Sequence, residues 1–405
     1  MRFGELKRLM SLKHLRLTDR NTRSVASAVP VAIDVDPPRP GARPRRADAF
    51  TMTPTERDGP PMSWRMPSET APQTRTWMAF PAEGPTLGET DAEREAGYAA
   101  WTAVAHAVAE FEPVTMVVDP AEVARARRML SSEIEIITAP VDEFWMRDAG
   151  PSFVLDPERP GVLGAVAWTF NGWGDHWWSE WRKSAGLGRL VAEAAGAELV
   201  SSLLVNEGGG IHVDGEGTVF LTETVQLDPR RNPYADRARV EAEMVRTIGA
   251  THAVWLPRGL TRDYEDFGTS GHVDIVATMP SPGVVLLHDQ RNPAHPDHAV
   301  SAELRAFFAE QTDAAGRPFT VRDLPAPDAV RDADGDTDWS YVNHLVVNGG
   351  VIACGFDEPE ADARARGILE EAYPGRRVVT VDARELYARG GGIHCITQQQ
   401  PEVGA

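Results

Sequence analysis

The sequence contains only two cysteines, Cys354 and Cys395, among 405 residues. Two cysteines cannot form the disulfide framework of a small secreted domain, so we expect a reducing compartment and consider each thiol separately. No stretch approaches the roughly 18 uninterrupted apolar residues of a membrane helix, and the N-terminus lacks the apolar run of a secretory signal. These absences predict a cytoplasmic protein that does not bind membranes.

Several motifs for cofactors and hydrolytic chemistry are also missing. The glycine runs lack the Lys-Ser/Thr of a phosphate loop and the spacing of a dinucleotide fingerprint, and there is no Gly-x-Ser-x-Gly motif and no metalloprotease helix. "DADGDTD" (332–338) has its glycine at the fourth position instead of the sixth, which favours an acidic surface loop over a calcium loop. "HPDH" (295–298) has no second cluster at zinc spacing. The sequence therefore predicts no cofactor and no metal.

Charge is distributed unevenly along the chain. Residues 1–50 contain 11 Lys/Arg and 5 Asp/Glu, whereas the remainder contains 30 and 55. The acidic remainder argues against nucleic-acid binding and is compatible with a small cationic substrate. "DPPRPGARPRRAD" (36–48) is rich in Pro and Arg and has no apolar periodicity. We therefore predict a disordered basic extension over 1–61 and one catalytic domain over 62–405.

The predicted domain begins with three strands and continues with repeated hairpins. Strands are expected at 75–80, 112–118 and 134–139, with an amphipathic helix at 91–111. Each hairpin has a Gly- or Pro-bearing turn; the hairpins are expected at 150–168, 208–224, 272–288 and 340–356. Helical stretches follow them at 184–197, 236–248, 299–312 and 360–373.

A polar residue precedes or begins the first strand of each repeated unit. These residues are Asp148, Glu207, His272, Asn343 and Cys395, at intervals of 59, 65, 71 and 52 residues. Repeated units that each supply one polar side chain would direct them to a shared centre in a closed, propeller-like α/β ring. The alternative is an ordinary α+β domain in which polar strand ends merely contact water.

The two cysteines have different surroundings in the sequence. Cys354 lies among apolar strand residues, which predicts a small buried hydrophobe. Cys395 is flanked by glycines, His394, Thr397 and glutamines, the polar and accessible surroundings that a reactive thiol needs. A structural cysteine in a terminal loop remains the alternative for Cys395.

The histidine and the carboxylates in this pattern are candidates for proton transfer and binding. If His272 and Asp274 lie in a strand, they share a face and can act on one ligand. Asp148 follows an aromatic residue at a strand threshold, and Glu207 precedes three glycines that allow close backbone approach. The alternatives are a structural histidine, turn caps, or an ion pair of Asp148 with Arg147.

Four ordered motifs resemble those of the agmatine deiminase and bacterial peptidyl-arginine deiminase family: "WMRDAGPSFV" (145–154), "NEGGGIHVDGEG" (206–217), "GHVD" (271–274) and "GGGIHCITQQQP" (390–401). "WRMPSE" and "TWMAFP" resemble its N-terminal strand region, so the resemblance covers roughly residues 64–401. It implies the pentein α/β-propeller, with five ββαβ-type units around a pseudo-five-fold axis. It also implies cofactor-free hydrolysis of a guanidinium group.

The resemblance implies a role for each motif residue. Cys395 would be the nucleophile, His272 the general acid and base, and Glu207 the carboxylate that orients the histidine. Asp148 and Asp274 would hold the guanidinium nitrogens, and Trp145 would form a wall of the substrate site. The polar run Gln398, Gln399 and Gln400 is expected to tie buried groups of the last strand to neighbouring segments.

The sequence also departs from the family pattern. Gly392 and Gly210 stand where family members commonly carry Asn and often Ser, and Gly268 and Ser270 lie where an acid often precedes the Gly-His pair. Glu265 and Asp266, slightly earlier, are the candidates for contacting the far end of the substrate.

The predicted reaction converts agmatine and water to N-carbamoylputrescine and ammonia, for putrescine biosynthesis. The alternatives are deimination of free or peptidyl arginine or of another guanidino compound, transfer of the amidino group to an amine, and an inactive binding scaffold. A metal-dependent guanidine hydrolase would need a set of His/Asp ligands. A homo-oligomer is compatible with the sequence.

Overall fold

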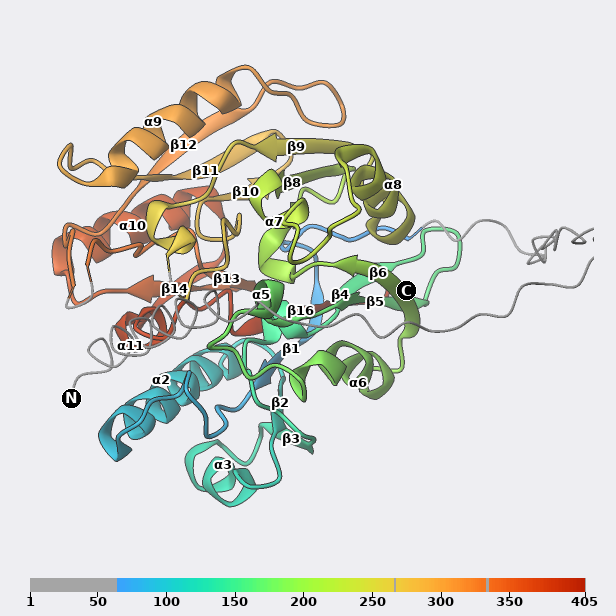
Figure 1. The fold of residues 1–405 in the computed structure, drawn as a ribbon, viewed down its shortest axis with the longest axis vertical. Coiled ribbons are helices and arrows are strands. Elements are labelled where there is room, and N and C mark those ends of the chain that lie inside the picture. Colours follow the sequence, from blue (N-terminus) through green and yellow to red (C-terminus); the bar gives the residue numbers. More distant parts are fainter. Residues whose placement is uncertain (1–63, 266, 333–334, 405) are drawn as a thin grey trace, which may run out of the picture. The chain divides into compact units, whose positions relative to one another are not determined.

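The computed structural model describes residues 64–265, 267–332 and 335–404. The predicted extension 1–61 therefore lies outside the described residues, and its boundary remains a prediction. Within the described ranges the strands form five sheets (Figure 1). None of the helices described there is long and apolar enough to cross a membrane.

The first and second sheets are connected through the chain segment around residue 146. The first unit contains β16 (Thr397–Pro401), β1 (Gln73–Ala79), α2 (Asp91–Ala109), β2 (Val114–Val118), α3 (Val123–Met129) and β3 (Glu135–Thr138). The second unit contains α4 (Met146–Ala149), β4 (Ser152–Leu155), β5 (Leu163–Thr169), α5 (Gly172–Asp175), η1 (Ser184–Gly186), α6 (Leu187–Ala194) and β6 (Glu198–Val205).

The remaining three units follow in chain order. The third contains η2 (Gly208–Gly210), β7 (His212–Val213), β8 (Thr218–Thr222), α7 (Glu223–Gln226), α8 (Arg237–Ile248) and β9 (His252–Leu256). The fourth contains η3 (Thr261–Tyr264), β10 (Ala277–Ser281), β11 (Val284–Asp289), α9 (Pro296–Ala309) and β12 (Thr320–Pro325). The fifth contains β13 (Leu345–Val347), β14 (Gly350–Gly355), α10 (Pro359–Ala372), β15 (Arg377–Asp382) and α11 (Arg384–Tyr387).

All five units share one topology. Two strands pair antiparallel, and a crossover that includes a helix then leads to a third strand parallel to the second. In the first unit the antiparallel partner of β1 is β16, which places Thr76 opposite Gln399. The two ends of the described chain therefore complete the same sheet. The prediction of a pentein fold with five ββαβ-type units is confirmed.

Local sequence signals account for several of these elements. Thr90 and Glu93 form a capping box at the start of α2. Asp236 caps the start of α8, and Gly249, with φ of 68°, ends it in a left-handed conformation. The predicted strands, hairpins and helices are confirmed, although most of their ends differ by a few residues.

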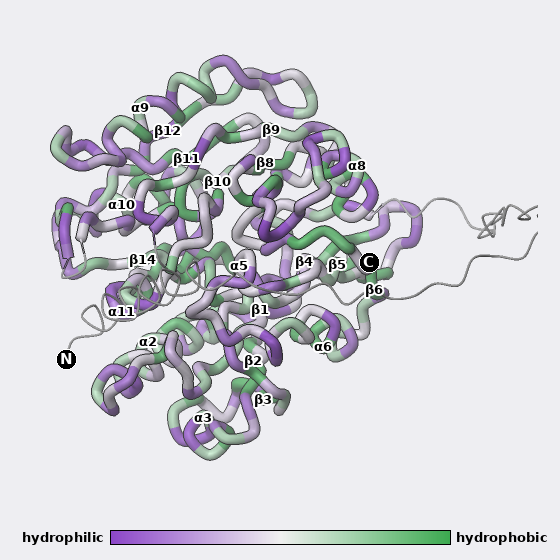
Figure 2. The backbone as a smooth tube through the Cα atoms, viewed as in Figure 1, coloured by the Kyte–Doolittle hydropathy of each residue, from purple (hydrophilic) through white to green (hydrophobic). Residues whose placement is uncertain are grey.

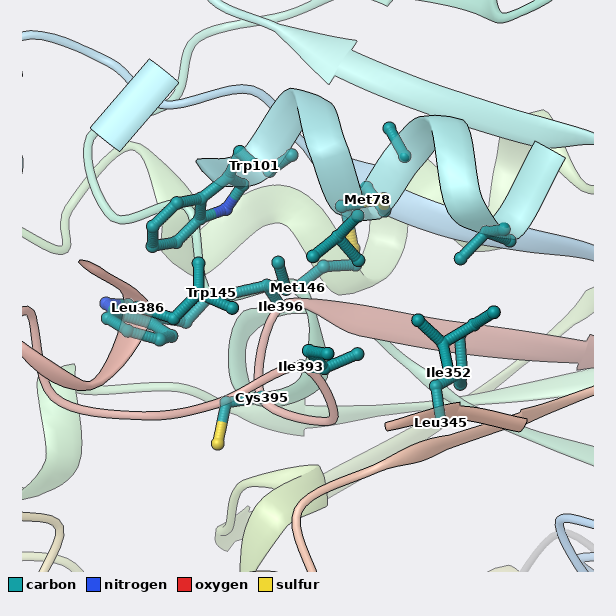
Figure 3. Packing of buried hydrophobic residues seen from close by; sticks show 14 of the residues in the cluster. Met78, Trp101, Trp145, Met146, Leu345, Ile352, Leu386, Ile393, Cys395 and Ile396 are labelled. Carbon is teal, nitrogen blue, oxygen red and sulfur yellow. The ribbon is translucent and has the colours of Figure 1, made fainter. Parts of the chain in front are cut away.

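Buried apolar side chains join neighbouring units. The largest cluster includes residues of β1, α2, β2, β14 and α10. In Figure 2 the outer helices carry both hydrophobic and hydrophilic residues, as expected when one helix face packs on a sheet. Figure 3 shows Cys395 as a member of this cluster, with its sulfur directed away from the other labelled side chains. The core thus ends where the polar centre begins.

Two of the three glutamines of β16 make the ties expected of them. Trp77 Nε1 donates to Gln400 Oε1 at 2.9 Å, and Arg147 Nη2 donates to Gln399 Oε1 at 2.8 Å. Gln398 differs, because its Oε1 is buried without a partner among the described residues and its amide reaches only the Gln399 carbonyl at 3.3 Å. The expectation holds for Gln399 and Gln400 and is wrong for Gln398.

Replacement of Gln399 and Gln398 by methionine should distinguish a glutamine that accepts a buried hydrogen bond from one that does not. Gln399→Met leaves a buried arginine donor without its acceptor and should cost about 2 kcal/mol of unfolding free energy. Gln398→Met removes an acceptor that has no donor and should change it by less than about 1 kcal/mol. Urea denaturation of both variants measures the difference, and equal losses would contradict the assignment of Gln399 as a tie.

Candidate active site

The predicted polar residues all lie in the segments that lead into the first strand of a unit. Asp148 lies in α4, Glu207 immediately precedes η2, and Asn343 precedes β13. His272 and Asp274 precede β10, and Cys395 precedes β16. All of these side chains are buried, with Cys395 the most exposed of the set at 7%.

A closed series of contacts joins these segments. Asn343 Nδ2 donates to Cys395 Sγ at 3.1 Å and to the backbone oxygen of Asp274 at 3.2 Å. His272 lies 3.4 Å from Glu207 and 3.9 Å from Asp148. The Arg147 amide completes the series by donating to the Cys395 carbonyl at 3.1 Å. The predicted shared centre is therefore present.

The geometry that brings His272 and Asp274 together differs from the one expected. Neither lies in a strand, because β10 begins only at Ala277. Asp274 lies in a turn in which the amides of Val276 and Ala277 donate to the Val273 carbonyl, and His272 precedes this turn. The amides of Val273 and Asp274 donate to the Gly209 carbonyl at 3.1 and 3.3 Å. The prediction of a shared strand face was wrong: the turn and Gly209 position Asp274, whereas the amide of His272 donates to Asp263 Oδ2 at 2.9 Å.

Gly209 explains why glycines follow Glu207. A Cβ at this position would lie 2.5 Å from His272 Nδ1, 2.9 Å from Asp148 Oδ1 and 3.1 Å from Asp274 Oδ2. Its amide also donates to Asp148 Oδ1 at 3.0 Å. Any side chain here would occupy the space between three candidate functional groups.

His272 and Glu207 form a buried pair that a second cation supports. His272 Nε2 lies 3.4 Å from Glu207 Oε2, and Arg231 Nε donates to Glu207 Oε1 at 3.0 Å. Burial opposes the charge on both partners. The attraction of Arg231 and His272 outweighs burial and lowers the pKa of Glu207 to about 2. For His272, burial lowers the pKa, but the charges of Asp148 and Glu207 outweigh burial and raise the pKa to about 9.

Asp148 is held by two donors. Besides the Gly209 amide, Trp173 Nε1 donates to Asp148 Oδ2 at 2.9 Å. Trp173 has φ of 58°, a left-handed conformation that is rare for a large residue. Burial raises the pKa of Asp148 to about 6, opposed by the charge of His272 and assisted by Asp274 and Glu207. Arg147 does not pair with Asp148; its guanidinium lies 3.6 Å from Glu69.

Asp274 has one committed oxygen and one free oxygen. Its Oδ2 lies 2.8 Å from His394 Nδ1 and accepts a longer bond of 3.4 Å from Cys395 Sγ. Its Oδ1 is buried, and no donor in the described ranges reaches it. Burial raises the pKa of Asp274, but the bond from His394 and its charge outweigh burial, so the pKa is lowered. A buried, ionised oxygen without a donor is suited to a cationic ligand.

The surroundings of Cys395 differ from those expected of a nucleophile. Burial raises its pKa well above the ordinary value, and the charges of Asp274 and Asp148 raise it further. The sequence predicted polar, accessible surroundings, but the thiol is buried and carboxylates are the charges beside it, so the thiol of the free protein is neutral. Cys354 matches its prediction, because it is buried in a strand and burial raises its pKa to about 12.

Three further residues were predicted to contact the substrate: Trp145, Glu265 and Asp266. Trp145 is buried beside Cys395: a Cβ on Gly391 would lie 3.1 Å from the Trp145 ring and 2.9 Å from Cys395 Sγ. Glu265 is exposed, and Asp266 lies outside the described residues. Their roles at the substrate's far end stay predictions.

Two family departures have a steric explanation. A Cβ at Gly392 would lie 2.5 Å from Asn343 Oδ1, the oxygen that accepts from the His394 amide at 3.0 Å. A Cβ at Gly268 would lie 2.1 Å from the Asp263 carbonyl. Neither position accommodates a side chain in this conformation. The structure gives no comparable clash at Gly210, where the nearest approach is 3.1 Å.

Sequence reasoning assigned no role to several residues that contact this centre. Trp173 and Arg231 carry no local signal, because their importance arises from contacts with distant Asp148 and Glu207. His394 adjoins Cys395 in the last motif, and Glu69 lies in the quoted "WRMPSE" segment, so position in a motif could have identified them. Asn343 was noted for its place in the repeat, without a contact to the thiol.

Comparison with known proteins agrees with this fold. Residues 65–401 match the model of the family described as Porphyromonas-type peptidyl-arginine deiminase. A Streptomyces coelicolor protein named "Putative agmatine deiminase" is 52% identical over 84% of this chain and 100% of its own. A Pseudomonas fluorescens protein named agmatine deiminase is 39% identical over 84% of this chain and 95% of its own.

A solved structure gives the same result. Agmatine deiminase of Enterococcus faecalis, at 30% identity, has a TM-score of 0.77 and covers 84% of this chain and 96% of its own. Fold, site and sequence therefore agree on the class of protein. The chain belongs to the Porphyromonas-type peptidyl-arginine deiminase family.

The carboxylate control of the thiol can be tested by alkylation. In a Cys354→Ala background, iodoacetamide should react slowly with Cys395 at pH 7.5 and faster as the pH rises. Asp274→Asn removes one negative charge, so the thiol pKa should fall by about one unit and the rate at pH 7.5 should rise about tenfold. A rate unaffected by this substitution would show that the carboxylate does not govern the thiol.

Proposed function

We propose that the protein is an agmatine deiminase, which hydrolyses agmatine to N-carbamoylputrescine and ammonia through a covalent intermediate on Cys395. The observation that carries the proposal is the buried thiol beside Asp274, whose Oδ1 has no donor within the described ranges. A guanidinium supplies a positive charge and planar donors to the Asp274 oxygen that lacks a partner. Relatives named agmatine deiminase support this substrate.

In the proposed complex, Asp148 and Asp274 accept hydrogen bonds from the guanidinium nitrogens. Two carboxylates fix the plane of the cation, and this orientation exposes its central carbon to the sulfur. Trp145 forms a wall of the site. Glu265 and Asp266 remain the candidates for contacting the distal ammonium.

Substrate binding also prepares the nucleophile. Burial, together with the charges of Asp274 and Asp148, raises the pKa of the Cys395 thiol and keeps it neutral in the free protein. A bound guanidinium neutralises those charges, so the thiol can lose its proton at neutral pH. The reactive thiolate then forms only when the electrophile is in place.

The chemical steps use Cys395 and His272. Thiolate attack forms the S–C bond, and protonated His272 gives a proton to the nitrogen that leaves as ammonia when its C–N bond breaks. The resulting thiouronium carbon is then attacked by water, whose proton His272 accepts. Cleavage of the C–S bond releases the ureido product and regenerates the thiolate. Glu207 holds the imidazole in line and stabilises its charge.

The pathway, the location and an alternative substrate complete the proposal. The product, N-carbamoylputrescine, suits putrescine biosynthesis, and we propose a cytoplasmic location. Deimination of free or peptidyl arginine is the second candidate, since the family includes peptidyl-arginine deiminases by its description. It would use the same five residues and differ only at the distal end of the substrate.

Product analysis separates these functions. Incubation with agmatine, arginine and an arginyl peptide should release ammonia and a ureido product fastest from agmatine, with no loss of rate in chelator. Cys395→Ala should abolish turnover, whereas Cys354→Ala should retain it. Release of urea instead of ammonia would contradict deimination, and faster turnover of arginine would reassign the substrate.

The pH dependence of kcat/KM for ammonia release should be bell-shaped. Asp148, whose pKa is about 6, loses its charge as the pH falls through that value, so guanidinium binding weakens on the acid side. His272, whose pKa is about 9, loses its proton as the pH rises through that value, so protonation of the leaving nitrogen fails on the alkaline side. Full activity persisting at pH 5 would exclude an essential ionised Asp148.

A further inference from the structure

We propose that His394 is a positioning residue that acts as a fixed imidazolium clamp and holds Asp274 in the orientation that binds the guanidinium. The proposal rests on the function proposed above, because Asp274 matters only if it receives a cation. His394 does not contact the reacting atoms in this scheme. It acts through Asp274, the carboxylate that contacts the guanidinium.

Both ring nitrogens of His394 face a carboxylate, so both must donate a hydrogen bond. Nδ1 lies 2.8 Å from Asp274 Oδ2, and Nε2 lies 2.8 Å from Glu69 Oε1. Ionised carboxylates only accept hydrogen bonds, and a neutral imidazole has only one N–H. Two carboxylates at this distance are therefore satisfied together only by the doubly protonated ring.

Other charged groups around His394 are consistent with this state. Its ring is buried, and it faces groups from four segments of the fold besides Asp274: Glu69, Arg147, His212 and His344. Burial and the charge of Arg147 oppose protonation, but the two carboxylates outweigh them, so the pKa of His394 is raised. For His212 and His344 burial, the largest cause, lowers the pKa, which leaves His394 as the protonated member of the three.

The clamp determines which oxygen of Asp274 is available. Oδ2 is committed to His394, and Oδ1 is left without a donor among the described residues. Without the imidazolium, Oδ2 would be free to rotate toward Cys395 Sγ, which already lies 3.4 Å away. Burial would then raise the pKa of Asp274, so a larger fraction would be protonated and unable to hold a cation.

A purely structural role predicts something different. If His394 only stabilises the buried polar layer, any substitution that removes one of its two bonds should harm folding and activity about equally. The chain offers a matched pair to separate these roles. The amide nitrogen of Asn can take the place of Nδ1, whereas that of Gln reaches the position of Nε2.

The experiment compares His394→Asn with His394→Gln. His394→Asn keeps a donor to Asp274 and should retain kcat/KM for agmatine within about tenfold of the unsubstituted protein. His394→Gln keeps only the donor to Glu69 and should lose about 100-fold, mainly through KM. Thermal unfolding should place the two variants within a few degrees of each other.

Binding keeps this test separate from the deiminase proposal. Calorimetric titration of agmatine into Cys395→Ala, alone and combined with each His394 substitution, should show the same order of affinities without turnover. Equal losses for the Asn and Gln variants, in kcat/KM or in affinity, would overturn the clamp. Failure of the unsubstituted protein to release ammonia would instead overturn the proposed function, with the binding order still deciding the role of His394.

Discussion

The burial of several carboxylates beside one thiol is the constraint on which the site depends. A buried charge is costly unless another charge and hydrogen bonds compensate it. Each carboxylate here has such support: Glu69 and Asp274 from His394, Glu207 from Arg231 and His272, and Asp148 from Trp173, Gly209 and the charge of His272. Cys395 has no cation of its own and therefore stays neutral until a ligand supplies one.

The fold provides this arrangement because each unit contributes one turn to the centre. Strand pairing between β16 and β1 brings the last motif next to the first sheet and places Cys395 beside Asn343 and Asp274. Glycines at the closest approaches, such as Gly209 and Gly392, leave room for functional groups of other units. Catalytic geometry and chain closure therefore depend on the same contacts.

Much of the fold was predictable because hydrophobic periodicity and turn residues recur in every unit. The polar residues at the unit starts could also be found, since the repeat marks their positions. Their conformations could not be predicted. Alternation suggested that His272 and Asp274 share a strand face, whereas Asp274 lies in a turn bonded to the Gly209 carbonyl and His272 precedes that turn. Trp173 and Arg231 were missed because nothing near them in sequence indicates contacts with Asp148 and Glu207.

The electrostatics were least accessible from sequence. Flanking glycines, His394 and glutamines suggested a thiol of lowered pKa, but the nearest charges in space are Asp274 and Asp148 from other units. Cys395 contacts an amide and a carboxylate, and the adjacent His394 turns its ring to Asp274 and Glu69. Adjacency in sequence thus identified a residue of the centre but not the charges that surround it.

The central claim is that Cys395 is neutral in the free protein and becomes ionised when a guanidinium binds. Rapid mixing with agmatine while the ultraviolet absorbance of the thiolate is recorded tests it directly, with Cys395→Ala as the blank. The account predicts no thiolate band in the free protein at neutral pH and a band that appears on mixing, before ammonia is released. A thiolate band already present without substrate, and unchanged on mixing, would contradict it.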